Sequence, residues 1–262
     1  CSGAAAWQGH ATFDGQIAMT SWPAGYERHV LDKVDSTLAE ARRMLPELTG
    51  PTWILGLEQT AARGRRGRAW STPKGNFAGT LVLRRTQDPA VAALRSFVAS
   101  LALYRSFVAL TDAPDAFALK WPNDVLLHGG KVAGILLESV GDFLMIGIGV
   151  NLVHAPGSDE VEPGAVTPVC LAQALGTDGS PEVFLDTLAR EYAALETQFV
   201  TYGFAPIRAA WLAHAARIGE VITARTMRQE TKGIFEDVDQ SGSLILGTAG
   251  GRVAITAADV FF

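Results

Sequence analysis

The chain has 262 residues, of which 48% are hydrophobic, and its formal net charge of −5 argues against a protein that coats nucleic acid. This length accommodates one large domain and one small domain. Two cysteines, Cys1 and Cys170, exclude a disulfide framework, and no stretch reads as a secretory signal or as a membrane span of about 20 apolar residues, which predicts a cytoplasmic protein.

The first predicted elements are a short strand over residues 30–34 and a helix over residues 35–45. Thr37 and Glu40 have the spacing of a capping box at the start of this helix. The plainer interpretation is that Ser36 and Thr37 only cap the helix. Their hydroxyls and the backbone N–H groups beside them would also be available to a polar ligand.

An arginine–glycine loop, residues 63–68 with the sequence Arg-Gly-Arg-Arg-Gly-Arg, follows a predicted buried strand over residues 52–57. Glycine lets the backbone approach a ligand closely, and the planar arginine side chain matches carboxylate and phosphate groups. In an acidic chain this cationic loop favours a small anionic ligand; a nucleic-acid contact or a solvated turn is the alternative. Gln59, before the loop, offers an amide donor and acceptor, although a surface glutamine is the default interpretation.

A strand over residues 77–83 and a buried helix over residues 89–110 are predicted next. Residues 117–127 then predict two short strands interrupted at residues 122–124, and a turn returns the chain as a third strand over residues 131–138. This arrangement brings together Lys120, Asn123, Asp124 and Lys131. Two lysines and an aspartate around a glycine turn suit phosphate and Mg²⁺ chemistry, and an ordinary surface hairpin is the alternative.

The apolar run over residues 143–150 predicts a central strand that is buried on both faces. Gly147 and Gly149 would leave its surface flat for a bicyclic ligand, and accommodation of a packed helix is the alternative. A helix that begins near residue 181 carries apolar residues at helical spacing, which predicts a core helix. From residue 219 onward, short β-prone segments separated by turns predict a small barrel.

Three motifs occur in order: the arginine–glycine loop, Lys120-Trp121-Pro122-Asn123-Asp124-Val125, and Lys131-Val132-Ala133-Gly134-Ile135-Leu136. Together they resemble the biotin–protein ligase family from Tyr26 to the C-terminus, with Ala62 where the family usually has glycine. The resemblance implies an α+β fold of the class II synthetase and biotin–lipoate ligase type: a mixed β-sheet flanked by helices, with a small C-terminal SH3-like β-barrel. It implies an N-terminal extension over residues 1–25, a catalytic domain over 26–215 and a small domain over 216–262.

The resemblance also implies a reaction in two steps, with ATP and Mg²⁺. Biotin attacks the α-phosphate of ATP, and a lysine of a biotin carboxyl carrier protein domain then attacks the biotinyl-5′-AMP. The catalytic residues implied are Lys131, Arg65 and Asp124, with Asp124 also as a Mg²⁺ ligand. The biotin-binding residues implied are Ser36, Thr37, Gln59, Arg63, Gly64, Arg65, Lys131, Gly134 and Gly147. The residues implied for ATP and the adenylate are Arg65, Arg66, Arg68, Trp70, Lys120, Asn123 and Asn151.

The main alternative is a lipoate or octanoate ligase or transferase of the related fold. Such enzymes lack this arginine–glycine loop, and the transferases use a cysteine, whereas Cys170 is predicted to be a buried apolar residue. A repressor with an N-terminal helix-turn-helix is disfavoured because few residues, and no basic cluster, precede Tyr26. A non-catalytic binding protein is a third alternative. The expected partners are the carrier domain and small molecules, without nucleic acid or membrane, and the resemblance allows a homodimer.

Overall fold

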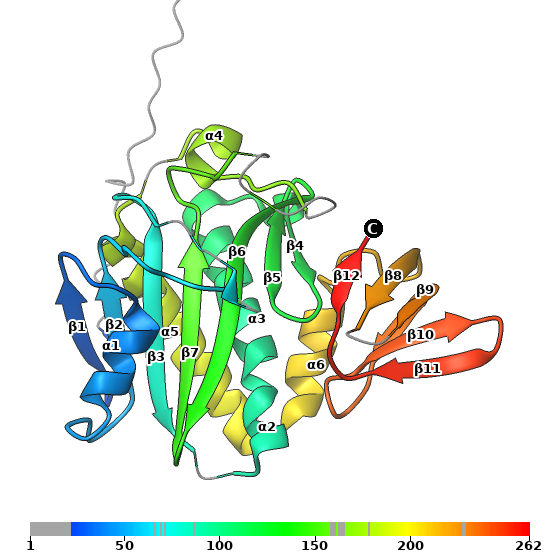
Figure 1. Cartoon of the computed structure of the whole chain (residues 1–262), viewed down its shortest axis with the longest axis horizontal. Helices are drawn as coiled ribbons and strands as arrows, with labels where there is room; N and C mark the ends of the chain where they lie inside the picture. The colour runs from blue at the N-terminus through cyan, green and yellow to red at the C-terminus, as the bar shows by residue number, and fades with distance from the viewer. Residues whose placement is uncertain are drawn as a thin grey trace, which may run out of the picture.

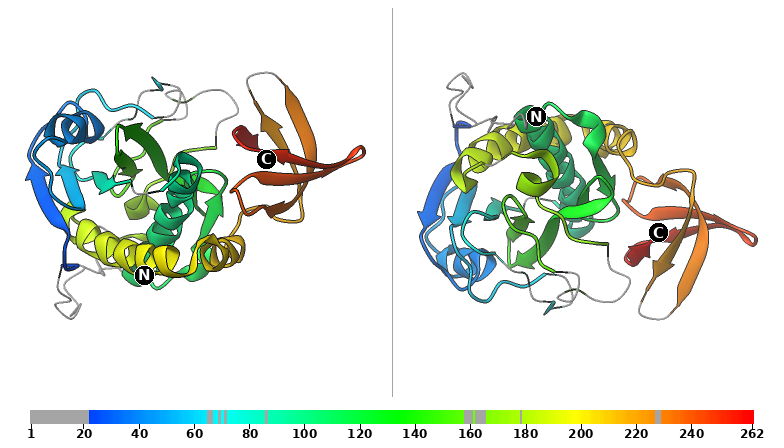
Figure 2. Two further views of the ribbon diagram at one scale, coloured as in Figure 1. Left: turned by 90° about the horizontal axis from the view of Figure 1, so that it is seen from below. Right: turned by 90° about the horizontal axis from the view of Figure 1, so that it is seen from above.

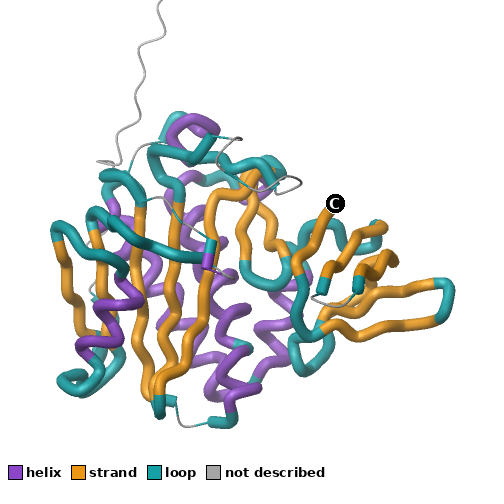
Figure 3. The backbone as a smooth tube through the Cα atoms, viewed as in Figure 1, coloured by secondary structure: helices purple, strands orange, loops and turns teal. Residues whose placement is uncertain are grey.

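The computed structural model describes residues 22–64, 67–68, 70, 72–85, 87–157, 161, 166–177, 179–226 and 229–262. These residues form a large β-sheet with helices on both faces and a smaller β-sheet near the C-terminus (Figures 1 and 3). This confirms the predicted α+β fold. Residues 1–21 of the predicted N-terminal extension lie outside the described part of the chain.

The large sheet has seven strands in the order β1-β2-β3-β7-β6-β5-β4. They are β1 (Glu27–Leu31), β2 (Thr52–Gly56), β3 (Phe77–Arg84), β4 (Phe117–Lys120), β5 (Asp124–Leu127), β6 (Gly130–Val140) and β7 (Phe143–Val150). β1 and β2 pair in parallel and the other neighbours are antiparallel, so the sheet is mixed as predicted. The first strand lies three residues earlier than expected, because Val34 makes only an isolated bridge, to Gln59.

Alternating side chains of the central strands serve two separate cores, as a pleated strand requires. On β2, Trp53 and Leu55 belong to the larger core, whereas Ile54 between them belongs to the smaller one. The larger core packs against α3 (Arg95–Thr111) and α5 (Pro181–Tyr202), and the smaller core packs against α1 (Thr37–Met44). Figure 2 shows α1 on the opposite side of the sheet from α3 and α5.

The long helix predicted over residues 89–110 is interrupted. It forms α2 (Pro89–Ala93) and α3, and the Leu94 N–H between them bonds the carbonyl of Val91, three residues back, at 3.2 Å. Within the described residues, the stretch Pro89–Thr111 is the single helical stretch long and apolar enough to cross a membrane, and 72% of its apolar 18-residue segment is buried in the protein. That burial is typical of a core helix.

Two shorter helices and the predicted core helix complete the large domain. α4 (Leu171–Leu175) follows Cys170, which is fully buried as predicted, and α6 (Phe204–Leu212) follows α5 directly. The residues of α5 predicted to be core are all buried, namely Phe184, Leu188, Tyr192, Leu195 and Phe199. α6 was not predicted from the sequence.

The smaller sheet has five antiparallel strands in the order β11-β10-β9-β8-β12. They are β8 (Val221–Arg225), β9 (Glu230–Val238), β10 (Leu244–Thr248), β11 (Gly251–Ile255) and β12 (Asp259–Phe261), and all of them lie in the β-prone region predicted from residue 219 onward. Buried side chains such as Phe235 and Leu246 continue the larger core of the first sheet. A domain of this size gains stability from such packing.

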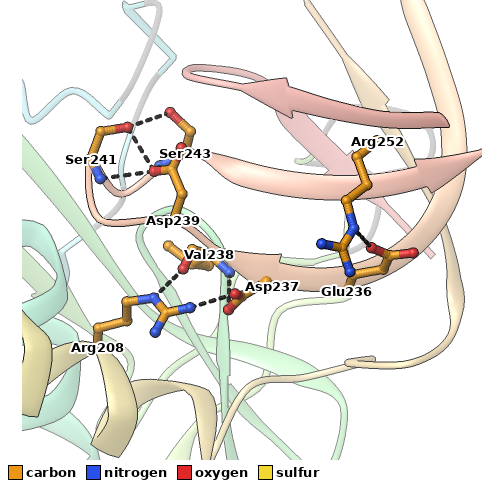
Figure 4. Close-up of polar contacts among 8 residues, drawn as sticks. All are labelled: Arg208, Glu236, Asp237, Val238, Asp239, Ser241, Ser243 and Arg252. Carbon is orange, nitrogen blue, oxygen red and sulfur yellow. Dashed lines mark hydrogen bonds and ion pairs between the residues drawn. The ribbon is translucent and has the colours of Figure 1, made fainter.

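Polar contacts also hold the small sheet against the helices and the large sheet. Arg208 of α6 bonds the Asp237 carboxylate and the Val238 carbonyl (Figure 4). In the next turn, the Asp239 carboxylate accepts hydrogen bonds from the backbone N–H groups of Ser241 at 2.8 Å and Ser243 at 2.9 Å (Figure 4). The same turn presents the Gly242 carbonyl to the indole N–H of Trp121 at 3.0 Å. The tryptophan of the Lys-Trp-Pro-Asn-Asp motif therefore anchors the C-terminal region.

Candidate active site

A cavity of about 580 Å³ brings together most of the residues that the sequence singled out. Its lining includes Ser36, Thr37, Gln59, Arg63, Gly64, Arg68, Trp70, Lys120, Asn123, Asp124, Lys131, Gly134, Gly147 and Asn151. Arg65 and Arg66, the two remaining predicted site residues, lie outside the described part of the chain. The cavity has a neutral polar end at Ser36, Thr37 and Gln59, and a charged end around Asp124.

The polar end is held by a chain of four side chains. The backbone N–H of Thr37 donates to Oε1 of Gln59 at 2.8 Å, and Oγ1 of Thr37 lies 3.2 Å from the same oxygen. Nε2 of Gln59 lies 3.0 Å from Oγ1 of Thr72, and Oγ1 of Thr80 lies 2.9 Å from Oγ1 of Thr37. Thr72 and Thr80 do not line the cavity, and the sequence analysis did not single them out.

One backbone N–H determines the direction of every hydrogen bond in this chain. Because the N–H of Thr37 can only donate, the Gln59 atom that receives it is the amide oxygen, and the amide nitrogen faces Thr72. The Thr37 hydroxyl must then donate to that oxygen, so the Thr80 hydroxyl must donate to Thr37. The hydroxyl hydrogen of Thr37 is therefore committed inside the protein.

These directions define what the polar end can offer a ligand. Oγ1 of Thr37 retains one lone pair and can only accept, whereas Nε2 of Gln59 retains one N–H and can only donate. Ser36 adds a hydroxyl that makes no capping bond to α1. A ligand that presents an N–H beside a C=O group would satisfy this set.

The predicted capping box is wrong. Ser36, not Thr37, is the N-cap residue, its side chain makes no capping bond, and Glu40 pairs with Arg43 instead. Asp35 accepts the backbone N–H of Ser36 at 2.8 Å. A hydrogen bond from Arg43, helped by the Ser36 N–H, lowers the pKa of the Asp35 carboxyl. The hydroxyls of Ser36 and Thr37 are thus not used on the helix end.

The middle of the cavity is apolar and partly filled by Trp70. Gly134 of β6 and Gly149 of β7 are paired across the sheet, and a methyl group added at Gly149 would come within 2.4 Å of the Trp70 ring. At Gly147, an added methyl group would come within 2.7 Å of Leu38 of α1. At Gly147 the neighbour is a helix, which was the alternative interpretation, whereas at Gly149 it is Trp70; both glycines also line the cavity, so a flat surface for a ligand stays a prediction. Further apolar lining comes from Ile135, Leu136, Ile148, Val161, Val166 and Pro168.

The charged end is centred on Asp124, the first residue of β5. Its carboxylate lies 2.7 Å from Nζ of Lys131 and 3.8 Å from Nζ of Lys120, as the hairpin prediction required. Lys131 also lies over the Trp70 ring, 5.5 Å from its centroid. Two ammonium groups around one carboxylate leave a net positive charge, which suits an anionic ligand.

The two asparagines assigned to the nucleotide have structural roles as well. Nδ2 of Asn123 donates to the carbonyl of Ile135, and Nδ2 of Asn151 donates to the carbonyl of Val169 at 3.1 Å. Asn151 is only 2% exposed, although it lines the cavity. Asn123 therefore supports β6, and Asn151 holds the segment that precedes α4.

The described residues do not provide a preformed Mg²⁺ site. No group of three histidine, cysteine, aspartate or glutamate side chains suited to a metal occurs among them, and the one carboxylate of the motif, Asp124, is paired with Lys131. Mg²⁺ commonly reaches proteins with one or two carboxylates and the phosphates of its substrate. Mg²⁺ binding by Asp124 therefore stays a prediction.

The C-terminal region contributes to the charged end, which the sequence analysis missed. Arg225, Asp259, Val260 and Phe261 line the cavity. The Asp259 carboxylate bonds the guanidinium of Arg68 at 2.9 Å and joins β12 to the arginine–glycine loop. The sequence carries no local signal for this contact, because the two residues are 191 positions apart.

Comparisons with known proteins agree with this geometry. Residues 30–152 match the model of the biotin/lipoate A/B protein ligase family, and residues 218–262 match that of the biotin protein ligase C-terminal domain. A biotin--[acetyl-CoA-carboxylase] ligase of Paracoccus denitrificans is 54% identical over 238 residues, which is 89% of this chain and 99% of that protein. The enzyme of the same name from Mycobacterium tuberculosis is 34% identical over 79% of this chain and 77% of its own length. The biotin protein ligase of Aquifex aeolicus, solved with biotin and ATP, has a TM-score of 0.80, 23% identity and coverage of 89% of this chain and 98% of that chain.

Proposed function

This chain belongs to the biotin–protein ligase family and is an ATP-dependent biotin ligase, and we propose that its cavity carries both steps of the reaction. In the first step biotin and ATP form biotinyl-5′-AMP and pyrophosphate. In the second, the biotinyl group passes to a lysine of a biotin carboxyl carrier protein domain. We further propose a cytoplasmic enzyme, with residues 26–215 as the catalytic domain and residues 216–262 as the small domain, and with a homodimer as one possible assembly.

The observation that carries this proposal is the hydrogen-bonding pattern of the polar end. The ureido ring of biotin presents N–H groups beside a carbonyl, which complement the acceptor of Thr37 and the donor of Gln59. The dithiolane ring of lipoate has neither group, so it would leave the buried Thr37 and the half-buried Gln59 without these hydrogen bonds. Cys170 gives no support to a cysteine-dependent transferase, because it is fully buried and its thiol lies 3.1 Å from the Val153 carbonyl.

The first step requires two anions to meet. A carboxylate oxygen of biotin forms a bond to the α-phosphorus of ATP, and the bond from that phosphorus to the pyrophosphate oxygen breaks. Lys131 lies at the charged end and can stabilise the negative charge that accumulates there. Arg63 and Arg68 line the same cavity, and Arg65 and Arg66 are assigned to the adenylate by resemblance alone.

The second step places an amine against the mixed anhydride. The carrier lysine attacks the biotinyl carbonyl carbon, an amide forms, and AMP leaves together with the proton of the amine. Asp124 holds Lys131 in position at 2.7 Å, so its carboxylate contributes to both steps by orienting that charge. The apolar middle, with Trp70 lying over Gly149, would limit the access of water to the anhydride.

The test is pyrophosphate release by the purified chain with ATP and either biotin or lipoate. We expect release with biotin, none above background with lipoate, and biotin transfer to a carrier domain that fails when its acceptor lysine is replaced by arginine. Equal release with both acids would overturn the assignment of biotin. Absence of release with biotin would overturn the proposed function.

A further inference from the structure

We propose that Thr80 and Thr72, which do not line the cavity, are positioning residues that select a ligand ring with an N–H beside a carbonyl. Thr80 acts on the acceptor at Thr37, and Thr72 acts on the donor at Gln59. This proposal depends on the proposed function and names the feature of the substrate that the polar end recognises.

Thr80 places a hydroxyl at a buried position where an apolar side chain is usual. It is fully buried in the middle of β3, between Gly79 and Leu81, and pairs with Ile54 of β2 and Gly147 of β7. Valine has nearly the same shape and would avoid the cost of burying a hydroxyl. The polar contact that offsets this cost is the hydrogen bond to Oγ1 of Thr37.

That hydrogen bond fixes the direction in which Thr37 can accept. The hydroxyl oxygen has four roughly tetrahedral directions: one to Cβ, one along its O–H bond to Gln59, and one lone pair toward Thr80. The fourth direction is the remaining lone pair. Without Thr80, the 3.2 Å contact to Gln59 alone would hold the hydroxyl, and its hydrogen could rotate toward a ligand N–H.

Thr72 does the same for the donor. Gln59 Nε2 has two hydrogens, and the bond to Oγ1 of Thr72 at 3.0 Å commits one of them. Because the amide is planar and its oxygen is held by the Thr37 N–H at 2.8 Å, the other hydrogen has one possible direction. Thr72 is 3% exposed and borders a second cavity of about 500 Å³ that Gln59 also lines. Donor and acceptor are therefore both oriented before a ligand arrives.

The experiment compares Thr80→Val and Thr72→Val with Thr80→Ser and Thr72→Ser in the full chain. We expect each valine variant to raise KM for biotin about 5- to 30-fold, because oriented hydrogen bonds are lost, while kcat and KM for ATP stay near the parent values. The serine variants keep the hydroxyl and should stay within about threefold of the parent. Thermal unfolding of all four variants would show whether any of them is poorly folded.

Desthiobiotin, which keeps the ureido ring but lacks the sulfur, separates orientation of the ring from damage to the apolar middle. We expect Thr80→Val to raise KM for desthiobiotin and KM for biotin by the same factor. An unchanged KM for biotin in folded valine variants would overturn the proposal, as would an equal rise in KM for ATP or a failure of serine to restore binding. If instead the parent releases no pyrophosphate with biotin, it is the proposed function that fails.

Discussion

The two ends of the cavity are built on different physical principles. At the polar end, Thr37 and Thr80 are almost completely buried, and each donor and acceptor already has a fixed direction. At the charged end, the side chains of Lys131 and Arg68 are 29% and 39% exposed and are held by ion pairs with Asp124 and Asp259. The polar groups of a neutral ring are recognised through the directions of their hydrogen bonds. A polyanion, by contrast, is attracted by positive charge whatever its orientation.

The difference also separates two parts of the chain. The polar end lies on α1, on β3 and on the segment between β2 and β3, so it draws on no residue of the small sheet. The charged end draws on the arginine–glycine loop and on β12 of the small sheet. Substitutions at the polar end should therefore change KM for biotin, whereas substitutions at the charged end should change KM for ATP or the rate of the first step.

The largest effect is expected from Lys131→Ala. Loss of a positive charge aimed at the reacting phosphate should lower the rate of pyrophosphate release at least about 100-fold, with little change in thermal stability. Lys232→Ala is the matched control, because Lys232 is an exposed lysine of β9 that does not line the cavity. Release by Lys131→Ala at a rate close to that of the Lys232→Ala control would remove Lys131 from the catalytic assignment.

At the polar end, Gln59→Glu should raise KM for biotin and leave KM for ATP nearly unchanged. The change is nearly isosteric but replaces the N–H donor with an acceptor and adds a negative charge, so KM for biotin should rise about 10-fold or more. Steady-state kinetics with each substrate varied in turn measures both constants. A larger rise in KM for ATP than for biotin would contradict the division of the cavity into two ends.

The contact between the loop and β12 should have a smaller effect. Arg68→Ala should raise KM for ATP about 3- to 10-fold, because one cation is lost from a site for a polyanion. Asp259→Asn keeps the cation and should change the same constant by less than about threefold, since a partly exposed ion pair contributes little. Measured at low and high salt, the Arg68→Ala defect should shrink at high salt. An equal rise in KM for ATP in both variants would mean that the intact ion pair, and not the positive charge of Arg68 alone, is required.

The smallest effect concerns the turn that joins the small sheet to Trp121. Partial burial raises the pKa of the Asp239 carboxyl, but hydrogen bonds from Ser241 and Ser243 outweigh it and the pKa lies below the ordinary value of 3.8. A carboxyl whose pKa is lower in the folded than in the unfolded chain stabilises the fold at pH values above the unfolded pKa. This stabilisation is lost as the pH falls through the folded pKa. Asp239→Asn should therefore lower Tm by no more than about 2 °C at pH 6.

The pH dependence of that difference supplies the check. The gap in Tm between the parent and Asp239→Asn should be constant from pH 6 down to about 4 and should narrow at more acidic pH, as Asp239 becomes protonated in both folded and unfolded chains. A gap that widens as the pH falls below about 4 would mean that the hydrogen bonds of this turn do not stabilise the ionised carboxylate.

Local patterns in the sequence predicted most of the strands and helices, and they predicted the three charged residues that meet at Asp124. Apolar runs and turn residues predicted the strands of both sheets, because these signals act within a few positions along the chain. Lys120, Asp124 and Lys131 meet as expected, because one short hairpin carries all three. The composition of the arginine–glycine loop predicts an anionic ligand, and this stays a prediction.

The orientation of the polar end and the contribution of the small sheet depend on contacts between residues far apart in the chain. Thr37 reaches Gln59 across 22 positions and Thr80 across 43, so local capping spacing gave the wrong role for its hydroxyl. Trp121 anchors Gly242 across 121 positions, and Arg68 meets Asp259 across 191. Periodicity and propensity describe neighbours on one element, whereas the direction of a buried hydrogen bond depends on which distant donor packing brings into contact.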